Sequence, residues 1–272
     1  MEQSKSTKVI GGIMLALTIV FCIMPFVSMF SAAIQPQGST PEGIQFTAHP
    51  QWHNFVDAWK MANITPLLLN SMLLVVVVVP SVVILCSLGG YAFAHLSVPC
   101  KGLIYFLFLI GLTIPFETLV TPLYYEISDM GILNTRLALM LPLIGLNIPF
   151  GIVWMRSCFE QMPRDLIEAA SIDGASGWVK MKNIILPLMM SSVTICLFLT
   201  LSRAFMVYDV NLSLTGGAPY GTTEMAAMHV YEKAFTSRQF GVGQAEAFIL
   251  FIIVACISGI QVYTTKKREV EA

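Results

Sequence analysis

The stretch PLLLNSMLLVVVVVPSVVILCSLGGYAF (residues 66–93) decides the class of fold. It contains no Lys, Arg, Asp or Glu and lies inside a longer charge-free run over residues 61–100. About 20 apolar residues, each rising about 1.5 Å along a helix, cross a hydrocarbon core of about 30 Å. Further charge-free runs cover residues 9–41, 137–155, 183–202 and 247–265. The sequence therefore predicts an all-α, polytopic membrane protein.

The composition agrees with this class and excludes others. Of the 272 residues, 56% are hydrophobic and only 11% are charged, whereas soluble domains carry about 25% charged residues. A soluble enzyme is therefore excluded, and a disordered chain is excluded because the sequence is too apolar. The formal net charge is −1 and no basic face stands out, so no nucleic-acid partner is expected.

Six transmembrane helices are predicted. They cover about residues 9–33, 66–93, 102–126, 137–156, 184–207 and 245–264, and Glu117 interrupts the third. The first is longer than the roughly 7–15 apolar residues of a signal peptide and is therefore predicted to be retained. With a cytoplasmic N-terminus, inside segments hold ten Lys and Arg residues and outside loops hold four, which favours cytoplasmic N- and C-termini.

Proline recurs inside the predicted spans. It removes a backbone donor and bends a helix, and within lipid such breaks persist where neighbouring helices or a water-filled cavity satisfy the freed carbonyls. A passive anchor has little use for them, so they indicate a transport path. The residues are Pro25, Pro80, Pro115, Pro122, Pro142, Pro149 and Pro187.

The longest cytoplasmic segment, RSCFEQMPRDLIEAASIDGASGWVKMKNIILP (156–187), is amphipathic and carries charges of both signs. Pro163 suits the first position of a helix, and Gly174 suits the left-handed residue that ends one. Ser176 is predicted to cap a second short helix that runs to about Lys182. The segment is therefore predicted to form a helix–turn–helix projection into the cytoplasm.

This projection resembles the "EAA" loop of ABC-importer permeases. Glu168-Ala169-Ala170, three residues, Gly174, nine residues, Ile184, one residue and Leu186-Pro187 match that pattern at every defined position. The string EAASIDGAS is similar to that of carbohydrate permeases, and the phrase LTGGAP at 214–219 agrees. The chain thus resembles one partner of a heterodimeric sugar permease pair, similar to the shorter permease of the maltose importer, with type I ABC importer permease architecture.

The resemblance implies that the loop couples the chain to a cytoplasmic ATPase. The expected partners are a second permease subunit, two copies of an ATP-binding subunit, an extracellular or periplasmic solute-binding protein and membrane lipid, in a bacterial or archaeal inner membrane. The alternative is that Glu168 only caps its own helix and Gly174 only ends it. The coupling residues implied by the motif are Glu168, Ala169, Ala170, Asp173, Gly174, Leu186 and Pro187.

The chain has no Gly-Lys pair and therefore no G-x-x-x-x-G-K-[ST] phosphate loop. No cofactor is expected on this chain, and ATP and Mg are expected on the partner ATPase. The six cysteines include no C-x-x-C pair, so no metal site is expected.

A translocation path is predicted from polar residues inside the spans, because such groups usually face a cavity or a partner. The alternative is ordinary interhelical hydrogen bonding or a salt bridge. The outer end of the fifth span and the following glycines are expected to face the binding protein. Candidates for the path are Glu117, Asn147, Ser192, Thr200 and Arg203, with Cys196 in the same stripe; candidates for the binding-protein contact are Tyr208, Asp209, Gly216 and Gly217.

Three parts are expected: residues 1–65 with the first helix and outer loop, a five-helix core over 66–265 with a coupling loop at 156–183, and a tail at 266–272. A sugar is the expected solute, with an amino acid, a polyamine or a glycerol phosphate derivative as alternatives. An ion-coupled secondary transporter would predict inverted repeats, and an intramembrane enzyme a nucleophile and base at spanning depth. The sequence shows neither.

Overall fold

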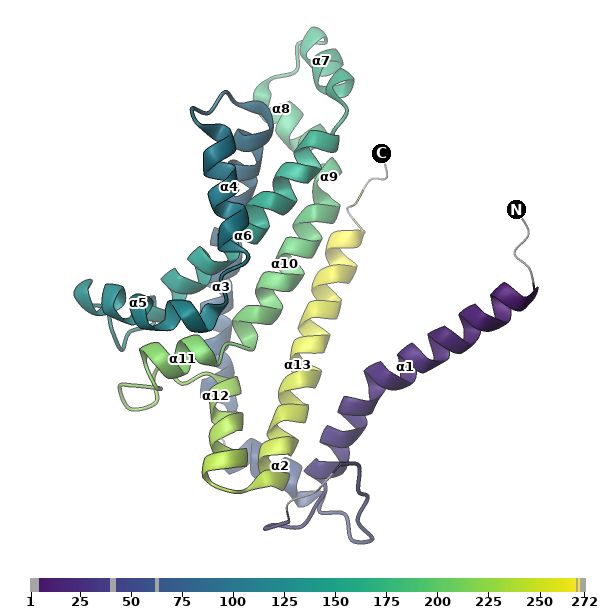
Figure 1. The fold of residues 1–272 in the computed structure, drawn as a ribbon, viewed down its shortest axis with the longest axis vertical. Helices are drawn as coiled ribbons and strands as arrows, with labels where there is room; N and C mark the ends of the chain where they lie inside the picture. The colour runs from purple at the N-terminus through teal and green to yellow at the C-terminus, as the bar shows by residue number, and fades with distance from the viewer. Residues whose placement is uncertain (1–4, 40–42, 62–63, 268, 270–272) are drawn as a thin grey trace. The chain divides into compact units, whose positions relative to one another are not determined.

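The computed structural model describes residues 5–39, 43–61, 64–267 and 269. Every regular element within these ranges is helical (Figure 1). The predicted all-α class is therefore confirmed. The chain forms two compact units, which are described separately: Met1–Ile64 with His229–Ile252, and Thr65–Met228 with Ile253–Ala272.

Four helices in the described residues are long and apolar enough to cross a membrane unbroken. They are α1 (Lys5–Ala33), α3 (Ile64–His95), α6 (Leu137–Gln161) and α13 (Phe240–Lys266). Two bent pairs meet the same test, which gives up to six spans. One pair is α4 (Lys101–Gly111) with α5 (Phe116–Asp129), and the other joins Gly177–Leu188 to α10 (Met190–Phe205).

The third predicted span is two helices rather than one interrupted helix. Helix α4 ends at Gly111, and α5 leaves it at 106° (Figure 1). Pro115 directly precedes α5 and has an extended backbone. Proline cannot continue the hydrogen-bond ladder of a helix and disfavours helix in the residue before it, which explains why the helix is interrupted here. Glu117 lies in the first turn of α5 and is exposed, where the helix dipole favours an acid.

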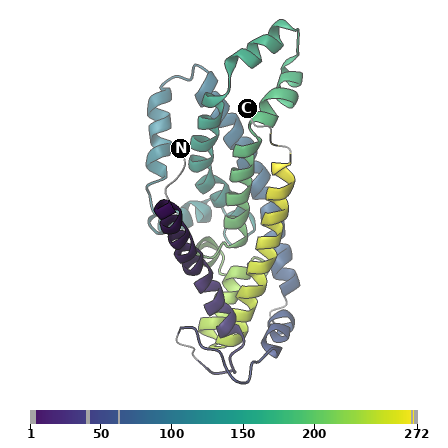
Figure 2. The same cartoon turned by 90° about the vertical axis from the view of Figure 1, so that its right-hand side faces the viewer.

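Small residues let α3 and α6 approach closely at the centre of the second unit. A Cβ added at Gly90 would lie 2.6 Å from the Cβ of Met155, and one added at Gly151 would clash with the Sγ of Cys86. Such contacts are typical of helix packing in membranes. Helix α10 packs against α6, and Figures 1 and 2 both show the two running side by side.

In the first unit, a buried side chain joins the end of α1 to α2 (His53–Met61). The Nδ2 of Asn54 donates to the carbonyl oxygens of Ala33 and Gln35, both at 2.8 Å. Ala33, Ala58, Val242 and Ala245 form a small buried cluster beside it. The unit thus packs through alanine contacts and backbone-directed hydrogen bonds.

A buried acid in the first unit was not among the predicted intramembrane groups. Glu246, near the start of α13, is 2% exposed, and its Oε1 lies 2.8 Å from the Nδ1 of His229 on α12 (Ala226–Tyr231). The apolar run begins at residue 247, so this carboxyl falls one residue outside it. The pair joins α12 to α13.

We expect His229→Ala to destabilise the folded chain by about 1–3 kcal/mol, because it leaves a buried side-chain oxygen of Glu246 without its hydrogen-bond partner. The free energy of unfolding of the purified protein in detergent measures this. His53→Ala is the matched control, since that imidazole is 72% exposed in its pair with Asp57 and an exposed pair contributes at most about 1 kcal/mol. Equal stability of the two variants would contradict the assigned role of the buried pair.

Candidate functional site

A cavity in the second unit lies between α6, α10 and the turn that joins α4 to α5. Its volume is about 790 Å³. We call it the Arg203 cavity. Its lining combines aromatic rings with one cation, one acid and an amide; the main contributors are Phe116, Asn147, Phe150, Ser202, Arg203, Tyr208 and Asp209.

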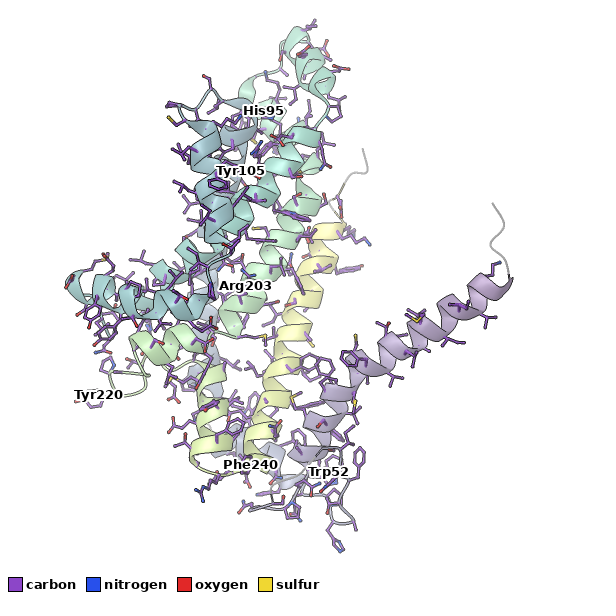
Figure 3. All side chains as sticks on the ribbon, in the orientation of Figure 1. Trp52, His95, Tyr105, Arg203, Tyr220 and Phe240 are labelled. Carbon is purple, nitrogen blue, oxygen red and sulfur yellow. The ribbon has the colours of Figure 1, made fainter. Side chains whose placement is uncertain are left out.

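Arg203, labelled in Figure 3, contacts two residues of α6. Its Nη1 donates to the Oδ1 of Asn147 at 3.0 Å, and its Cζ lies 5.8 Å from the ring centroid of Phe150, within cation–π range. The Nδ2 of Asn147 donates in turn to the carbonyl oxygen of Leu143 at 2.7 Å, which fixes the orientation of the amide. A guanidinium has five N–H donors, so Arg203 retains donors for a polar solute.

The structure distributes the predicted path residues over different surroundings. Asn147 and Arg203 line the Arg203 cavity, together with Tyr208 and Asp209, which were predicted to meet the binding protein. Thr200 and Cys196 are 3% and 1% exposed, and Cys196 lies beside Gly151. Among the described residues, Glu117 forms no ion pair with Arg203.

The candidate glycines for the binding-protein contact follow α11 (Asp209–Leu214), a helix that packs on α5 and α6. Gly216 and Gly217 both have positive φ angles, 53° and 82°. Tyr220, in the same loop, is fully exposed (Figure 3). The loop therefore presents a turn and an aromatic side chain to its surroundings.

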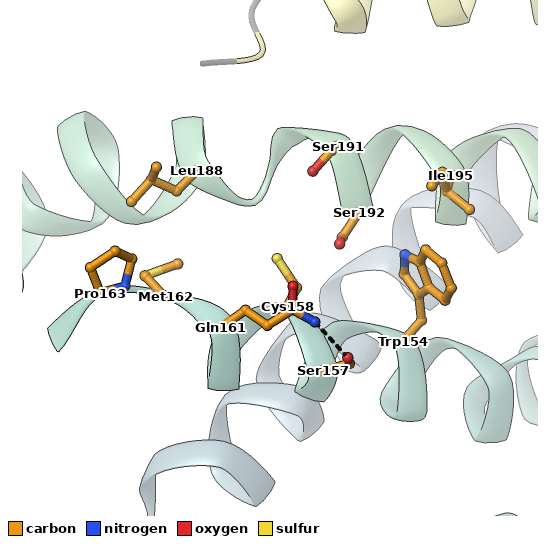
Figure 4. A pocket seen from close by; sticks show the side chains of 10 residues that line it. All are labelled: Trp154, Ser157, Cys158, Gln161, Met162, Pro163, Leu188, Ser191, Ser192 and Ile195. Atoms are coloured by element: carbon orange, nitrogen blue, oxygen red, sulfur yellow. Dashed lines mark hydrogen bonds between the residues drawn. The ribbon is translucent and has the colours of Figure 1, made fainter. Parts of the chain in front are cut away.

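A second cavity, of about 380 Å³, lies between the end of α6 and the start of α10. We call it the Trp154 cavity (Figure 4). The Nε2 of Gln161 donates to the Oγ of Ser157 at 3.2 Å within it. It includes Ser192, another predicted path residue, and adjoins the loop with the EAA pattern. Its lining is Trp154, Ser157, Cys158, Gln161, Met162, Pro163, Leu188, Ser191, Ser192 and Ile195.

The loop with the EAA pattern forms a helix–turn–helix. Helix α7 (Arg164–Ile172) follows Pro163, which is the residue before the helix rather than its first residue as predicted. Gly174 has a φ of +77°, and the backbone N–H of Ala175 donates to the carbonyl of Ala170 at 2.9 Å. This pattern is a left-handed helix stop.

The second half of the loop begins with the predicted cap. The Oγ of Ser176 accepts from the backbone N–H of Val179 at 3.4 Å, opening α8 (Gly177–Lys180). A π-helical segment, Met181–Ile185, and α9 (Leu186–Leu188) follow before a 67° bend into α10. The Nζ of Lys180 donates to the Oγ of Ser171 at 3.0 Å, which ties α8 to α7.

Apolar side chains on this loop are exposed to an unusual degree. Ile172 is 86% exposed and Trp178 is 73% exposed. Glu168 is exposed as well, and it is the fifth residue of α7, whereas the acid in the first turn is Asp165. A surface of this kind suits contact with a partner more than a capping role for Glu168.

Long apolar helices, two cavities that combine polar with apolar lining, and an exposed helix–turn–helix are typical of a multi-pass membrane permease. The chain belongs to the family described as "Binding-protein-dependent transport system inner membrane component", whose model matches residues 14–270. Members of this family are ABC transporter permease subunits.

Two relatives and a solved structure illustrate the similarity. The chain is 52% identical over 112 residues to the "Probable starch degradation products transport system permease protein AmyD" of Thermoanaerobacterium thermosulfurigenes, a match covering 41% of this chain and 38% of that protein. It is 32% identical over 204 residues to the "Diacetylchitobiose uptake system permease protein NgcG" of Streptomyces coelicolor, covering 73% and 67%. A bacterial ABC transporter involved in the import of alginate shares the fold, with a TM-score of 0.69 and 16% identity over 100% of both chains.

Proposed function

We propose that this chain is one permease half of an ATP-driven, binding-protein-dependent importer that moves a sugar or oligosaccharide by alternating access. The names of the relatives, which include starch degradation products and diacetylchitobiose, support a carbohydrate as the solute. The Arg203 cavity supports it too, because aromatic rings beside a few polar groups suit a solute of that kind. Path residues would be Asn147, Arg203 and Ser192.

The observation that carries the proposal is the exposed helix–turn–helix at 164–180. Small side chains at Ala169 and Ala170 allow close helix approach, and Glu168 offers a charge-assisted contact to a basic group. Asp173 and Gly174 shape the turn, and Leu186-Pro187 begin the return to the membrane. ATPase subunits docked here would transmit their closure to α6 and α10.

The remaining partners follow from the same role. One half makes no enclosed path, so a second permease subunit completes it, with two ATP-binding subunits that use ATP and Mg. The excess of Lys and Arg on one side supports cytoplasmic termini. The outer loop, with Tyr208, Asp209, Gly216 and Gly217, would meet the solute-binding protein. Residues 1–65 would form the first helix and outer loop, residues 66–265 the permease core, and residues 266–272 the tail.

Uptake by proteoliposomes that contain the complete complex tests the solute class. We expect ATP-dependent accumulation of a sugar such as maltotriose or N,N′-diacetylchitobiose, and only when a binding protein loaded with that sugar is present. Accumulation of a polyamine, an amino acid or a glycerol phosphate instead would overturn the carbohydrate assignment. Uptake driven by an ion gradient without ATP would overturn the importer class.

A further inference from the structure

The two cavities share one face of α6. Leu143, Asn147 and Phe150 line the Arg203 cavity, and Trp154, Ser157, Cys158 and Gln161 line the Trp154 cavity. Successive members of this series are one, three or four positions apart, and together they occupy one stripe of a helix with 3.6 residues per turn. The cavities therefore follow one another along a single helix face.

Helix α10 also contributes residues to both cavities. Ser191 and Ile195 line the Trp154 cavity, while Ser202 and Met206 line the Arg203 cavity. Spacings of four and seven place Ser191, Ile195 and Ser202 on one face of α10, and Met206 directly follows the helix. Since α6 and α10 pack against each other, the two cavities lie along the same pair of helices, the Trp154 cavity near the start of α10 and the Arg203 cavity near its end.

An aromatic pair on α6 has one ring in each cavity. The rings of Phe150 and Trp154 are stacked, with centroids 6.1 Å apart and planes inclined by 14°. Phe150 lines one cavity and Trp154 the other. Two residues of the predicted polar stripe, Cys196 and Thr200, are buried and line neither of these two cavities.

We propose that the Trp154 cavity is a second binding subsite for the transported sugar, next to the coupling loop, and that the Phe150–Trp154 stack carries pyranose rings to it from the Arg203 cavity. This inference rests on the proposed function. The C–H faces of a pyranose are apolar and its rim carries hydroxyls, which suits a cavity that has an indole at one end and Ser157, Gln161, Ser191 and Ser192 in its lining (Figure 4). No charged side chain is among the described residues that line this cavity, so we expect the subsite to take an uncharged sugar unit.

Cys158 provides a direct test, because its thiol lines the cavity. The nucleotide-free complex is treated with N-ethylmaleimide at increasing concentrations of the transported sugar, and peptide mass spectrometry reads each cysteine separately. We expect the sugar to slow modification of Cys158 in a saturable manner. Cys100, which is exposed just before α4, is the matched control and should react at an unchanged rate.

Variants test the aromatic contact in transport. We expect Trp154→Ala to lower sugar uptake about tenfold, the equivalent of 1.4 kcal/mol, while ATP hydrolysis stimulated by the loaded binding protein persists. Trp154→Phe should restore most of the uptake because a ring face returns. Trp59→Ala removes an exposed tryptophan of α2 and should leave uptake unchanged.

Several outcomes would overturn the subsite. One is sugar uptake with no protection of Cys158, and another is normal uptake by Trp154→Ala. A Cys158 that fails to react even without sugar would show that another subunit fills the cavity. In each of these cases stimulated ATP hydrolysis would still stand, whereas its absence in the unmodified complex would overturn the proposed function itself.

Discussion

Gly174→Val abolishes ATP-driven uptake while the chain still inserts in the membrane: this is the largest effect that we expect. Gly174 has a φ of +77°, a conformation that a β-branched residue rarely adopts. Strain of about 1–3 kcal/mol would force the turn between α7 and α8 to rearrange. The surface formed by Glu168, Ile172 and Trp178 would then no longer fit its partner.

The geometry makes this variant a clean test of coupling. A Cβ at Gly174 meets no atom within 4 Å, so the substitution acts through the backbone and not through a clash in the core. Gly102→Val is the control, because that position is also open, has no positive φ and lies outside the helix–turn–helix at 164–180. The measurements are recovery of the ATPase subunit with the tagged chain and sugar uptake, and normal values for Gly174→Val would refute the coupling role.

Arg203→Ala is expected to have the second largest effect, on transport rather than on coupling. Hydrogen bonds to charged groups contribute about 1.5–3 kcal/mol, which corresponds to roughly a 10- to 150-fold loss of uptake. Stimulated ATP hydrolysis should remain, because the helix–turn–helix at 164–180 is untouched. Arg203→Lys should recover little, since a lysine lacks the planar fork that meets Asn147 and a solute together.

A structural role for Arg203 makes a different prediction. If its hydrogen bond to Asn147 only joins α10 to α6, then Arg203→Ala should lower the free energy of unfolding and leave uptake per folded complex unchanged. That result would remove Arg203 from the path. Lys60→Ala, at an exposed position at the end of α2, is the control for a general loss of positive charge.

The sequence was sufficient for the features that depend on local chemistry. Charge-free runs placed the spanning helices because a charge in lipid is costly wherever the helix packs. Gly174 and Ser176 placed the end of α7 and the start of α8, since both act on their own backbone. The EAA pattern indicated the family for a similar reason, because all of its positions lie within one short segment of the chain.

Features that depend on packing were not predictable in the same way. Pro115 signalled a bend, but the 106° turn between α4 and α5 depends on what each helix packs against. The polar stripe from Ser192 to Arg203 was predicted from polarity alone. Close packing at Gly151 buries Cys196, so the middle of the stripe lines neither of the two cavities. The α6 face with Phe150 and Trp154 was missed because it combines apolar rings with hydroxyls, although its spacing was visible. His229 and Glu246 are 17 positions apart in the sequence, and no local pattern predicts that they pair.

The central claim is that the helix–turn–helix at 164–180 links this permease to an ATPase. The most direct measurement purifies the tagged chain from its native membrane in mild detergent, transfers it to lipid and measures ATP hydrolysis with and without a sugar-loaded binding protein. We expect a second permease and an ATPase subunit to co-purify, with hydrolysis rising only for the loaded binding protein. A chain that retains no ATPase, yet accumulates its solute in response to an ion gradient, would contradict the account.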